Sequence, residues 1–261
     1  MKKSKTFCVG DLHGNYKALL QCLERSNFDY ENDKLIQLGD IVDGWSETVE
    51  CVKELMKIKN LILIKGNHDD WFMRWVKTNR HPANWQQGGK PTLKSYISNF
   101  NPNAELIEHY SLNQTSFLPS DVPQKHIDFF NQMKPYHIED NNLFVHGGFN
   151  RHFDIEDSVY NSENVLMWDR DLWMSALSFQ SMSKNSIDAR FNMYNKFDNV
   201  FIGHTSTINW GTTEPMNAAN IWNLDTGAGY KGRLTIMNVE TKEYFQSDLS
   251  HLLYPDEKGR N

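Results

Sequence analysis

The sequence contains few cysteines, and their spacing excludes two common roles. Cys8, Cys22 and Cys51 are the only three among 261 residues. An odd number cannot pair completely in disulfides, and no two of them have the close C-x-x-C spacing of a zinc or redox site. Small buried thiols in a reducing compartment are the interpretation that these cysteines favour.

Long apolar runs are also missing. No stretch approaches the roughly 20 apolar residues that a membrane-spanning helix requires. The opening residues MKKSKTFCVG have a basic start but lack the apolar run of about 7 to 15 residues that a signal peptide requires. We therefore expect a cytoplasmic protein that has no membrane partner.

An excess of positive charge is the third absence, since the formal net charge is -6 at pH 7. A protein that follows an extended nucleic acid needs clustered Lys and Arg to neutralise the phosphates. The charge therefore argues against a long nucleic-acid partner. It leaves open a small phosphorylated substrate that is held by a metal ion.

The first eighty residues repeat a strand, a polar loop and a helix three times. Each expected strand is a short apolar run, and the strands cover residues 6–9, 34–38 and 61–65. The loops that follow are GDLHG, GDIVDGW and GNHD, and the helices follow at 15–25, after a cap at Ser46, and through Arg74. Repetition of this kind predicts parallel pairing in an α/β sheet. Ligands of such sheets bind beyond the carboxyl ends of the strands, where all three loops lie.

Regular structure is expected again after residue 142. Strands over residues 143–145, 199–202 and 220–224 lead into HGGF, GHTS and DTGAGY, and residues 233–239 and 243–246 predict a terminal hairpin. The tail after Pro255 is expected to fray. Between the two halves, residues 79–135 are rich in proline and carry few strand signals. We expect this segment to be a mostly helical or irregular insertion over the site.

Metal-binding side chains follow five of the expected strands. They are Asp11, His13, Asp40, Asn67, His68, His146 and His204. Carboxylates, imidazoles and an amide oxygen without a thiolate suit Mn²⁺, Fe or Zn²⁺. Seven groups exceed the needs of one ion. A carboxylate that bridges two ions about 3.5 to 4 Å apart would explain the surplus.

These motifs resemble those of a known superfamily. GDLHG, GDIVDG, GNHD, HGG and GHT resemble, in order, the five motifs of the metallophosphoesterases, and they are most similar to the phosphoprotein phosphatase branch. NWQQGG, MWDR and LDTGA further resemble stretches of the bacterial and phage Ser/Thr phosphatases, including that of bacteriophage lambda. The resemblance implies a layered αββα sandwich of mixed sheets with flanking helices. It also implies a single domain over residues 1–261, with 79–135 as its insertion.

The resemblance assigns a role to each motif residue. It implies two divalent metal ions, with Mn²⁺ as the first expectation, and a bridging hydroxide as the nucleophile. The first ion would be held by Asp11, His13 and Asp40, and the second by Asp40, Asn67, His146 and His204. His68 would be the general acid, oriented by Asp43, and the substrate phosphate would contact Asn67 and Arg170. A general-acid role for His68 is consistent with its neighbour, because a carboxylate beside a histidine is expected to fix its tautomer and raise its pKa.

Two positions depart from the family pattern. Gly44 stands where the phosphatases carry an arginine that clamps phosphate, and Asp69 stands where they usually carry Glu. Arg170 can act alone, and Arg74 or Arg151 are candidates to replace the missing guanidinium. Both departures bear on the substrate class and leave the metal chemistry unchanged.

The expected activity is two-metal-dependent hydrolysis of phosphomonoesters, as in a Ser/Thr protein phosphatase that acts on a phosphorylated protein or a small phosphoester. A symmetrical dinucleoside polyphosphate hydrolase carries the same motifs and is the first alternative. A phosphodiesterase or nuclease of the superfamily is the second. A binding scaffold that has lost catalysis is the third, although every expected metal ligand and His68 are present.

Overall fold

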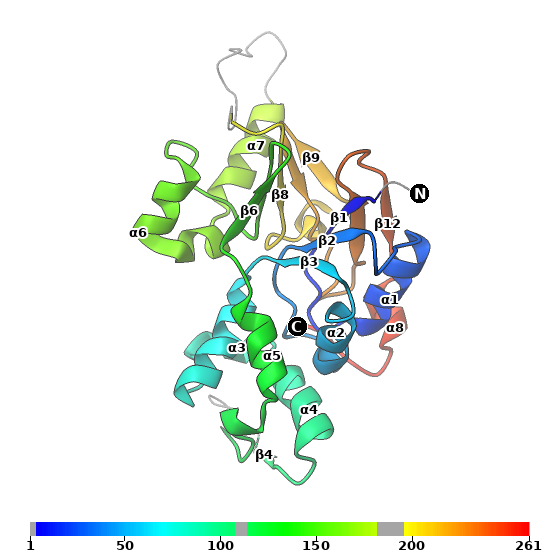
Figure 1. Ribbon diagram of the computed structural model, residues 1–261, viewed down its shortest axis with the longest axis vertical. Coiled ribbons are helices and arrows are strands. Elements are labelled where there is room, and N and C mark those ends of the chain that lie inside the picture. Colours follow the sequence, from blue (N-terminus) through cyan, green and yellow to red (C-terminus); the bar gives the residue numbers. More distant parts are fainter. Residues whose placement is uncertain (1–3, 108–113, 182–195, 261) are drawn as a thin grey trace.

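Two five-stranded mixed sheets pack against each other, with helices on their outer faces (Figure 1). The computed structural model describes residues 4–107, 114–181 and 196–260, and only the backbone of residues 107, 114 and 158–163. The first sheet has the order β12-β11-β1-β2-β3. Its strands are β1 Thr6–Val9, β2 Lys34–Gln37, β3 Asn60–Leu63, β11 Thr235–Asn238 and β12 Tyr244–Gln246. The strands β1, β2 and β3 are parallel, and the predicted hairpin of β11 and β12 joins β1 in antiparallel pairing.

The second sheet has the order β6-β7-β8-β10-β9. Its strands are β6 Tyr136–Glu139, β7 Asn142–Val145, β8 Asn199–Ile202, β9 Met216–Ala218 and β10 Ile221–Asn223. The central three, β7, β8 and β10, are parallel, and the outer two are antiparallel to their neighbours. The two sheets therefore share one plan, in which a parallel centre aims several strand ends at the same edge.

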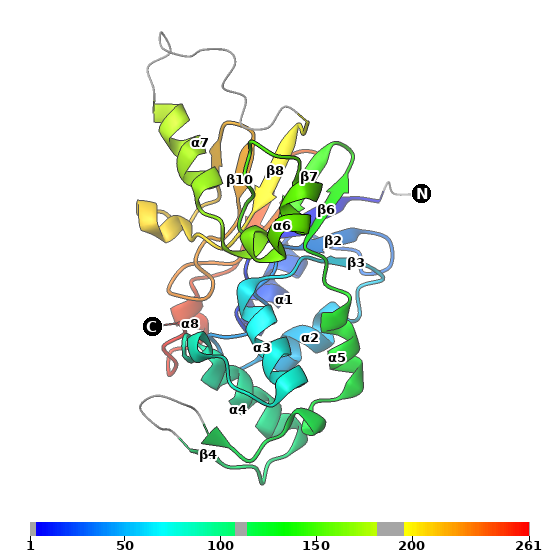
Figure 2. The same cartoon turned by 90° about the vertical axis from the view of Figure 1, so that its left-hand side faces the viewer.

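Helices cover both outer faces. Figure 2 shows α1 and α2 beside the first sheet, and α6 and α7 beside the second. Their bounds are α1 Tyr16–Arg25, α2 Thr48–Leu55, α3 Asn67–Thr78, α6 Ile155–Trp168, α7 Asp171–Ser181 and α8 Ser250–Leu253. Apolar side chains from both sheets, such as Ile36, Phe144 and Phe201, form the core between them. The predicted αββα sandwich is confirmed.

Residues 79–135 are mostly helical, with a short hairpin among the helices. The segment comprises the 3₁₀ turns η1 Ala83–Gln86 and η2 Pro119–Asp121, the helices α4 Gly89–Phe100 and α5 Gln124–Asn131, and the strands β4 Leu106–Ile107 and β5 Gln114–Thr115. Its helices pack beside α2 and α3, at the lower end of the molecule in Figure 1. Trp85 and Thr92 of this segment bind Asp43 in the loop after β2, the Gly88 carbonyl accepts from the Gly44 N–H at 3.2 Å, and Gln87 lines the cavity beside these loops.

Two local predictions are wrong. Ser46 does not cap α2, because its hydroxyl donates to Glu257 Oε1 at 2.7 Å and its N–H donates to Oε2 at 3.1 Å. The tail after Pro255 does not fray, because these two bonds and a third hold it. The third runs from the Arg260 N–H to the Gly229 carbonyl at 2.8 Å. Among the residues described, no helix is long and apolar enough to cross a membrane.

Candidate metal centre

Five strand ends meet at one edge of the sandwich. Asp11, Asp40 and Asn67 follow β1, β2 and β3 of the first sheet, whereas His146 and His204 follow β7 and β8 of the second. All five are buried or nearly so. Strand ends of parallel sheets carry ligands in this way because the loops there converge. The structure therefore brings together the side chains that the motifs single out.

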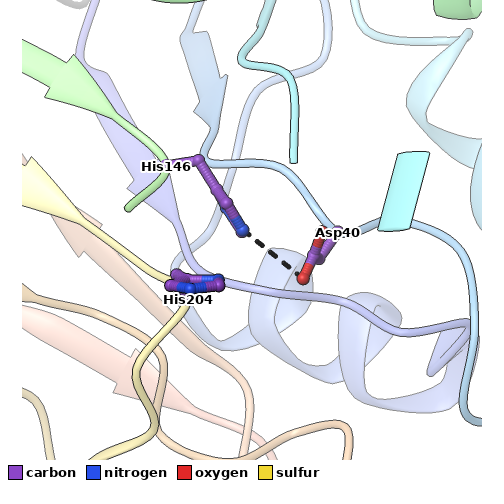
Figure 3. A group of neighbouring side chains, drawn as sticks. All are labelled: Asp40, His146 and His204. Atoms are coloured by element: carbon purple, nitrogen blue, oxygen red, sulfur yellow. Dashed lines mark ion pairs between the residues drawn. The ribbon is translucent and has the colours of Figure 1, made fainter. Parts of the chain in front are cut away.

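Asp40 lies at the middle of the cluster. Its Oδ2 is 3.4 Å from His146 Nε2 and 3.7 Å from His13 Nε2, and the His146 Nε2 is 3.1 Å from Asn67 Oδ1. Figure 3 shows the His146 ring aimed at the Asp40 carboxylate, with His204 beside them. Two groups of three residues could each hold an ion, because the ligand atoms within each group all lie within 4.8 Å of one another. Asp40 belongs to both groups. The groups are Asp11, His13 and Asp40, and Asp40, His146 and His204.

The imidazoles present the nitrogen that a metal ion needs. His13 Nδ1 lies 3.0 Å from the Val42 carbonyl, and His146 Nδ1 lies 2.7 Å from the Leu38 carbonyl. A carbonyl can only accept, so each Nδ1 carries the proton and Nε2 faces the cluster. His204 Nε2 is buried and has no hydrogen-bond partner among the residues described. Buried polar atoms are rarely left unpaired, so the donor set fits divalent cations.

Electrostatics separate the groups into charged and neutral members. Burial lowers the pKa of His204, as does the neighbouring His146, and burial together with the Arg260 cation lowers the pKa of His13. Burial opposes charge at Asp40 as well, but the imidazoles around it hold its pKa well below the ordinary value. The charge of Asp40 overcomes burial at His146 and raises its pKa to about 10. A cation between the two would compete with a proton for His146 Nε2.

Four of these residues adopt a left-handed backbone. The φ angles are +51° at His13, +55° at Asp40, +70° at Asp43 and +65° at His204. Residues with a side chain seldom adopt this conformation, which costs on the order of 1 to 3 kcal/mol each and clusters at functional sites. The loops hold these side chains in place at the expense of local stability.

His68 and Asp43 form a second buried unit beside the first. The His68 Nδ1 is 2.7 Å from Asp43 Oδ2, while Asp43 Oδ1 accepts from Trp85 Nε1 at 3.0 Å and from Thr92 Oγ1 at 2.8 Å. Burial lowers the pKa of His68 to about 3 and raises the pKa of Asp43 to about 8. The expected rise of the His68 pKa beside Asp43 is therefore wrong for this structure, because burial opposes charge on the ring. Since Asp43 occupies Nδ1, His68 has only Nε2 to offer the adjoining cavity, which its ring lines.

Comparison with known families identifies the fold and its chemistry. The calcineurin-like phosphoesterase family matches residues 4–207, which include the five motifs GDLHG, GDIVDG, GNHD, HGG and GHT. The chain is a calcineurin-like phosphoesterase. Members of this family act with divalent metal ions, and the two groups of ligands around Asp40 are the residues that could hold them.

Relatives of this phosphoesterase include enzymes with two different activities. It is 25% identical to the symmetrical bis(5'-nucleosyl)-tetraphosphatase of Pasteurella multocida, over 92% of this chain and 95% of the relative. It is 21% identical to the serine/threonine-protein phosphatase 1 of Salmonella typhimurium, over 89% of this chain and 90% of the relative. A crystal structure described as a candidate diadenosine tetraphosphatase superposes with a TM-score of 0.61 at 15% identity, covering 94% of this chain and 93% of its own, and shows the fold alone.

The phosphoesterase has a cavity of about 520 Å³ beside the cluster. Asp40, Asn67, His68 and His204 line it, and so does Arg170. The other two arginine candidates lie outside this lining. Arg74 pairs with Asp70 on the surface of α3, with 2.6 Å between Nε and Oδ2, and Arg151 is likewise not a lining residue.

Asp69 holds loops and does not face the cavity of the phosphoesterase. Its carboxylate accepts backbone N–H groups from Asp40 at 2.7 Å, Ile41 at 2.9 Å, Gly66 at 3.1 Å and Val42 at 3.4 Å. The loop after β2 and the start of α3 are tied together by this one side chain. The departure from Glu at this position therefore concerns how Asp40 is positioned.

Two residues of the phosphoesterase site escaped the sequence analysis. Asp225 follows β10 and is buried. Burial is the largest cause of the raised pKa of Asp11, and the charge of Asp225 is the next. The strand-end rule that selected the other acids would have found it. Arg260 lines the 520 Å³ cavity from the far end of the chain, and its Nη1 lies 2.9 Å from His13 Nε2. No local sequence signal points to this contact.

Proposed function

We propose that this phosphoesterase hydrolyses phosphomonoesters with two divalent metal ions, in the manner of the bacterial and phage Ser/Thr phosphatases. Mn²⁺ is the proposed ion, with Fe and Zn²⁺ as alternatives. One observation carries the proposal, namely the two ligand groups that share Asp40 beside the buried pair of His68 and Asp43.

The proposed ligand sets follow the two groups. Asp11, His13 and Asp40 would hold one ion, and Asp40, Asn67, His146 and His204 the other. Two ions held by a shared carboxylate lower the pKa of a water and neutralise phosphoryl oxygens during in-line displacement. The carbonyls of Val42 and Leu38 bind the Nδ1 atoms of His13 and His146, so each Nε2 would be free to hold an ion.

His68 would supply the proton that the leaving oxygen needs. Asp43 holds the ring through Nδ1, so the proton transferred to substrate is the one on Nε2. Trp85 and Thr92 fix Asp43 in turn, so the whole unit is held before substrate arrives. A positioned general acid contributes about 10² to 10⁴ in rate. Asn67 and Arg170, both in the cavity lining, would contact the phosphate.

Substitution of ligands tests the metal chemistry. Asp40→Asn and His204→Asn should abolish turnover of p-nitrophenyl phosphate with Mn²⁺. Asp40→Asn removes the ligand that both groups share, and His204→Asn removes a ligand from one group. Asp256→Asn and His152→Asn are matched controls, since both side chains are exposed and outside the site. Near-normal rates in Asp40→Asn or His204→Asn would refute the proposal.

His68→Asn tests the general acid separately. It should retain bound metal, measured by elemental analysis, and lose about 10² to 10⁴ in kcat. The loss should be smallest for leaving groups such as p-nitrophenolate, which depart without a proton. An equal loss for phenyl phosphate and p-nitrophenyl phosphate would remove His68 from this role.

Symmetrical cleavage of dinucleoside tetraphosphates is the second candidate. A second cavity of about 840 Å³ adjoins the first and shares Gln87, Tyr230 and Arg260 with it. Cations line the pair, namely Lys90, Lys94, Arg170, Lys231, Lys258 and Arg260. An extended polyphosphate with a base at each end suits two joined cavities with basic walls, although the chain as a whole is acidic. The full-length similarity to a symmetrical tetraphosphatase favours the same substrate.

A comparison of three substrates separates the candidates. Rates on a phosphoserine peptide, on diadenosine tetraphosphate and on bis-p-nitrophenyl phosphate are measured with the same metal. A higher kcat/KM on the peptide supports the monoester phosphatase. Preferential conversion of diadenosine tetraphosphate to two molecules of ADP supports the second candidate, and preference for the diester would contradict both.

A further inference from the structure

The C-terminal tail crosses the loop that follows β2 and brings Arg260 to His13 of the candidate metal centre. Tyr254 stacks on Trp45 with 5.0 Å between ring centroids, and Glu257 accepts both bonds from Ser46. Gly259 has a φ of +64°, and a Cβ there would lie 2.7 Å from Trp45 Cζ2. A side chain at position 259 would therefore meet both strain and a clash. The tail follows one defined path.

Three glycines make room for the Arg260 side chain along this path. A Cβ at Gly44 would lie 3.2 Å from Arg260 Cγ, one at Gly88 would lie 3.4 Å from the same atom, and one at Gly229 would lie 3.2 Å from Cδ. Gly44 is the position where the sequence lacks an expected arginine. In space, the stem of Arg260 passes the place that a side chain of residue 44 would begin to fill.

The guanidinium is held at the opening of the metal cluster. Its central carbon lies 5.1 Å from the centroid of the Tyr230 ring, which favours a cation over its face. Its Nη1 donates to His13 Nε2 at 2.9 Å. Arg260 also lines both the 520 Å³ and the 840 Å³ cavities, so it stands at their junction.

Metal binding at His13 would make this position favour an anion next to Arg260. The Nε2 lone pair of His13 serves one partner at a time, so a His13 that ligates metal leaves the guanidinium without its acceptor. The positive charge of Arg260 would then lie beside the charge of the ion, in a partly dry pocket where repulsion is costly. A phosphoryl oxygen between the two relieves the repulsion, and the planar fork of Arg can bind two such oxygens.

We propose that Arg260, delivered by the C-terminal tail, binds the phosphate of the substrate and takes the place of the arginine that is missing at Gly44. The inference rests on the proposed function, because it names a further phosphate-binding residue for that same site. Arg170, which also lines the 520 Å³ cavity, would bind the phosphate together with it.

Three variants test this role. Arg260→Ala removes the guanidinium, Arg260→Lys keeps the charge but loses the fork, and Arg80→Ala is the matched control, which removes an exposed guanidinium that lines neither cavity. Inorganic phosphate binding to the Mn²⁺-loaded proteins is measured by calorimetry, together with metal content and thermal unfolding. Values of kcat and KM for p-nitrophenyl phosphate complete the set.

Arg260→Ala should weaken phosphate binding by about 10- to 100-fold, which is typical of a charge-assisted hydrogen bond, with metal content unchanged. Arg260→Lys should fall between Arg260→Ala and wild type, and Arg80→Ala should match wild type. The proposal is overturned if Arg260→Ala binds phosphate as Arg80→Ala does, if it binds phosphate more tightly than wild type, or if it loses metal. A wild type that hydrolyses no phosphoester would refute the proposed function, while the phosphate-binding comparison would still decide the role of Arg260.

Discussion

Asp69→Asn is expected to destabilise both the fold and the metal centre. The carboxylate accepts four backbone N–H groups, two on each oxygen. An asparagine amide offers one oxygen and one NH₂, so about two buried N–H groups would face a donor and lose their acceptor. Each such group costs about 1 to 3 kcal/mol, so the free energy of unfolding should fall by about 2 to 6 kcal/mol.

The measurement is thermal unfolding of the metal-free protein, with Asp70→Asn as the control. For a chain of this size each kcal/mol shifts Tm by about 2 to 4 °C, so Asp69→Asn should unfold roughly 5 to 20 °C lower. Asp70 is the next residue and pairs with Arg74 at the surface, where an ion pair contributes about 1 kcal/mol or less. The same substitution one position on should therefore lower Tm by only a few degrees.

Metal affinity provides the second readout. Because two of the bonds reach the backbone of Asp40 and Ile41, the ligand loop should lose its position and Mn²⁺ affinity should drop by about 10- to 100-fold, as for other supporting residues of metal sites. Equal Tm values and equal affinities for Asp69→Asn and Asp70→Asn would show that the N–H bonds of Asp69 do not support the loop.

Three further outcomes follow from contacts described above. Trp85→Phe removes a 3.0 Å bond to Asp43 and should lower kcat about 5-fold at constant metal content, a loss of about 1 kcal/mol; an unchanged kcat contradicts this. Burial lowers the pKa of His126 to about 4, with Lys53 and Lys125 adding to the effect, so the unfolded chain binds more protons between about pH 4 and 6.5. Stability should therefore fall by about 1 to 2 kcal/mol from pH 7 to pH 5, and His126→Gln should lose this component of the pH dependence in denaturant titrations. Chelation should lower Tm relative to protein in Mn²⁺ at 100 times its Kd, where ligand binding adds about 2.7 kcal/mol, and an unchanged Tm would argue against binding to the folded state.

The parts of the fold that sequence could predict are those set by short-range patterns. The strand, loop and helix units around GDLHG, GDIVDGW and GNHD are local, since an apolar run, a glycine turn and an amphipathic helix each follow from neighbouring residues. The same holds for the β11–β12 hairpin, which the structure bears out. The rule that ligands lie beyond strand ends then selected the metal-ligand residues, and it did not require the strands to be assigned to two sheets.

The parts that could not be predicted depend on contacts between distant residues. Ser46 is a residue type that often caps helices, but its hydroxyl binds Glu257, which lies 211 positions further along the chain. Arg260 looks like an ordinary charged residue near a chain end until Gly44, Gly88 and Gly229 are known to border its path. Local propensity carries no information on such encounters, because tertiary packing decides them.

The two ligand groups differ in where their residues come from. Asp11, His13 and Asp40 all belong to loops of the first sheet, whereas the group with His146 and His204 takes two of its three members from the second. One ion could thus bind to a half-assembled molecule, while the other would report that the two sheets have docked. Sequential loading would follow, and a substitution in the inter-sheet layer, such as Phe201→Ala, should weaken the later ion far more than the earlier one.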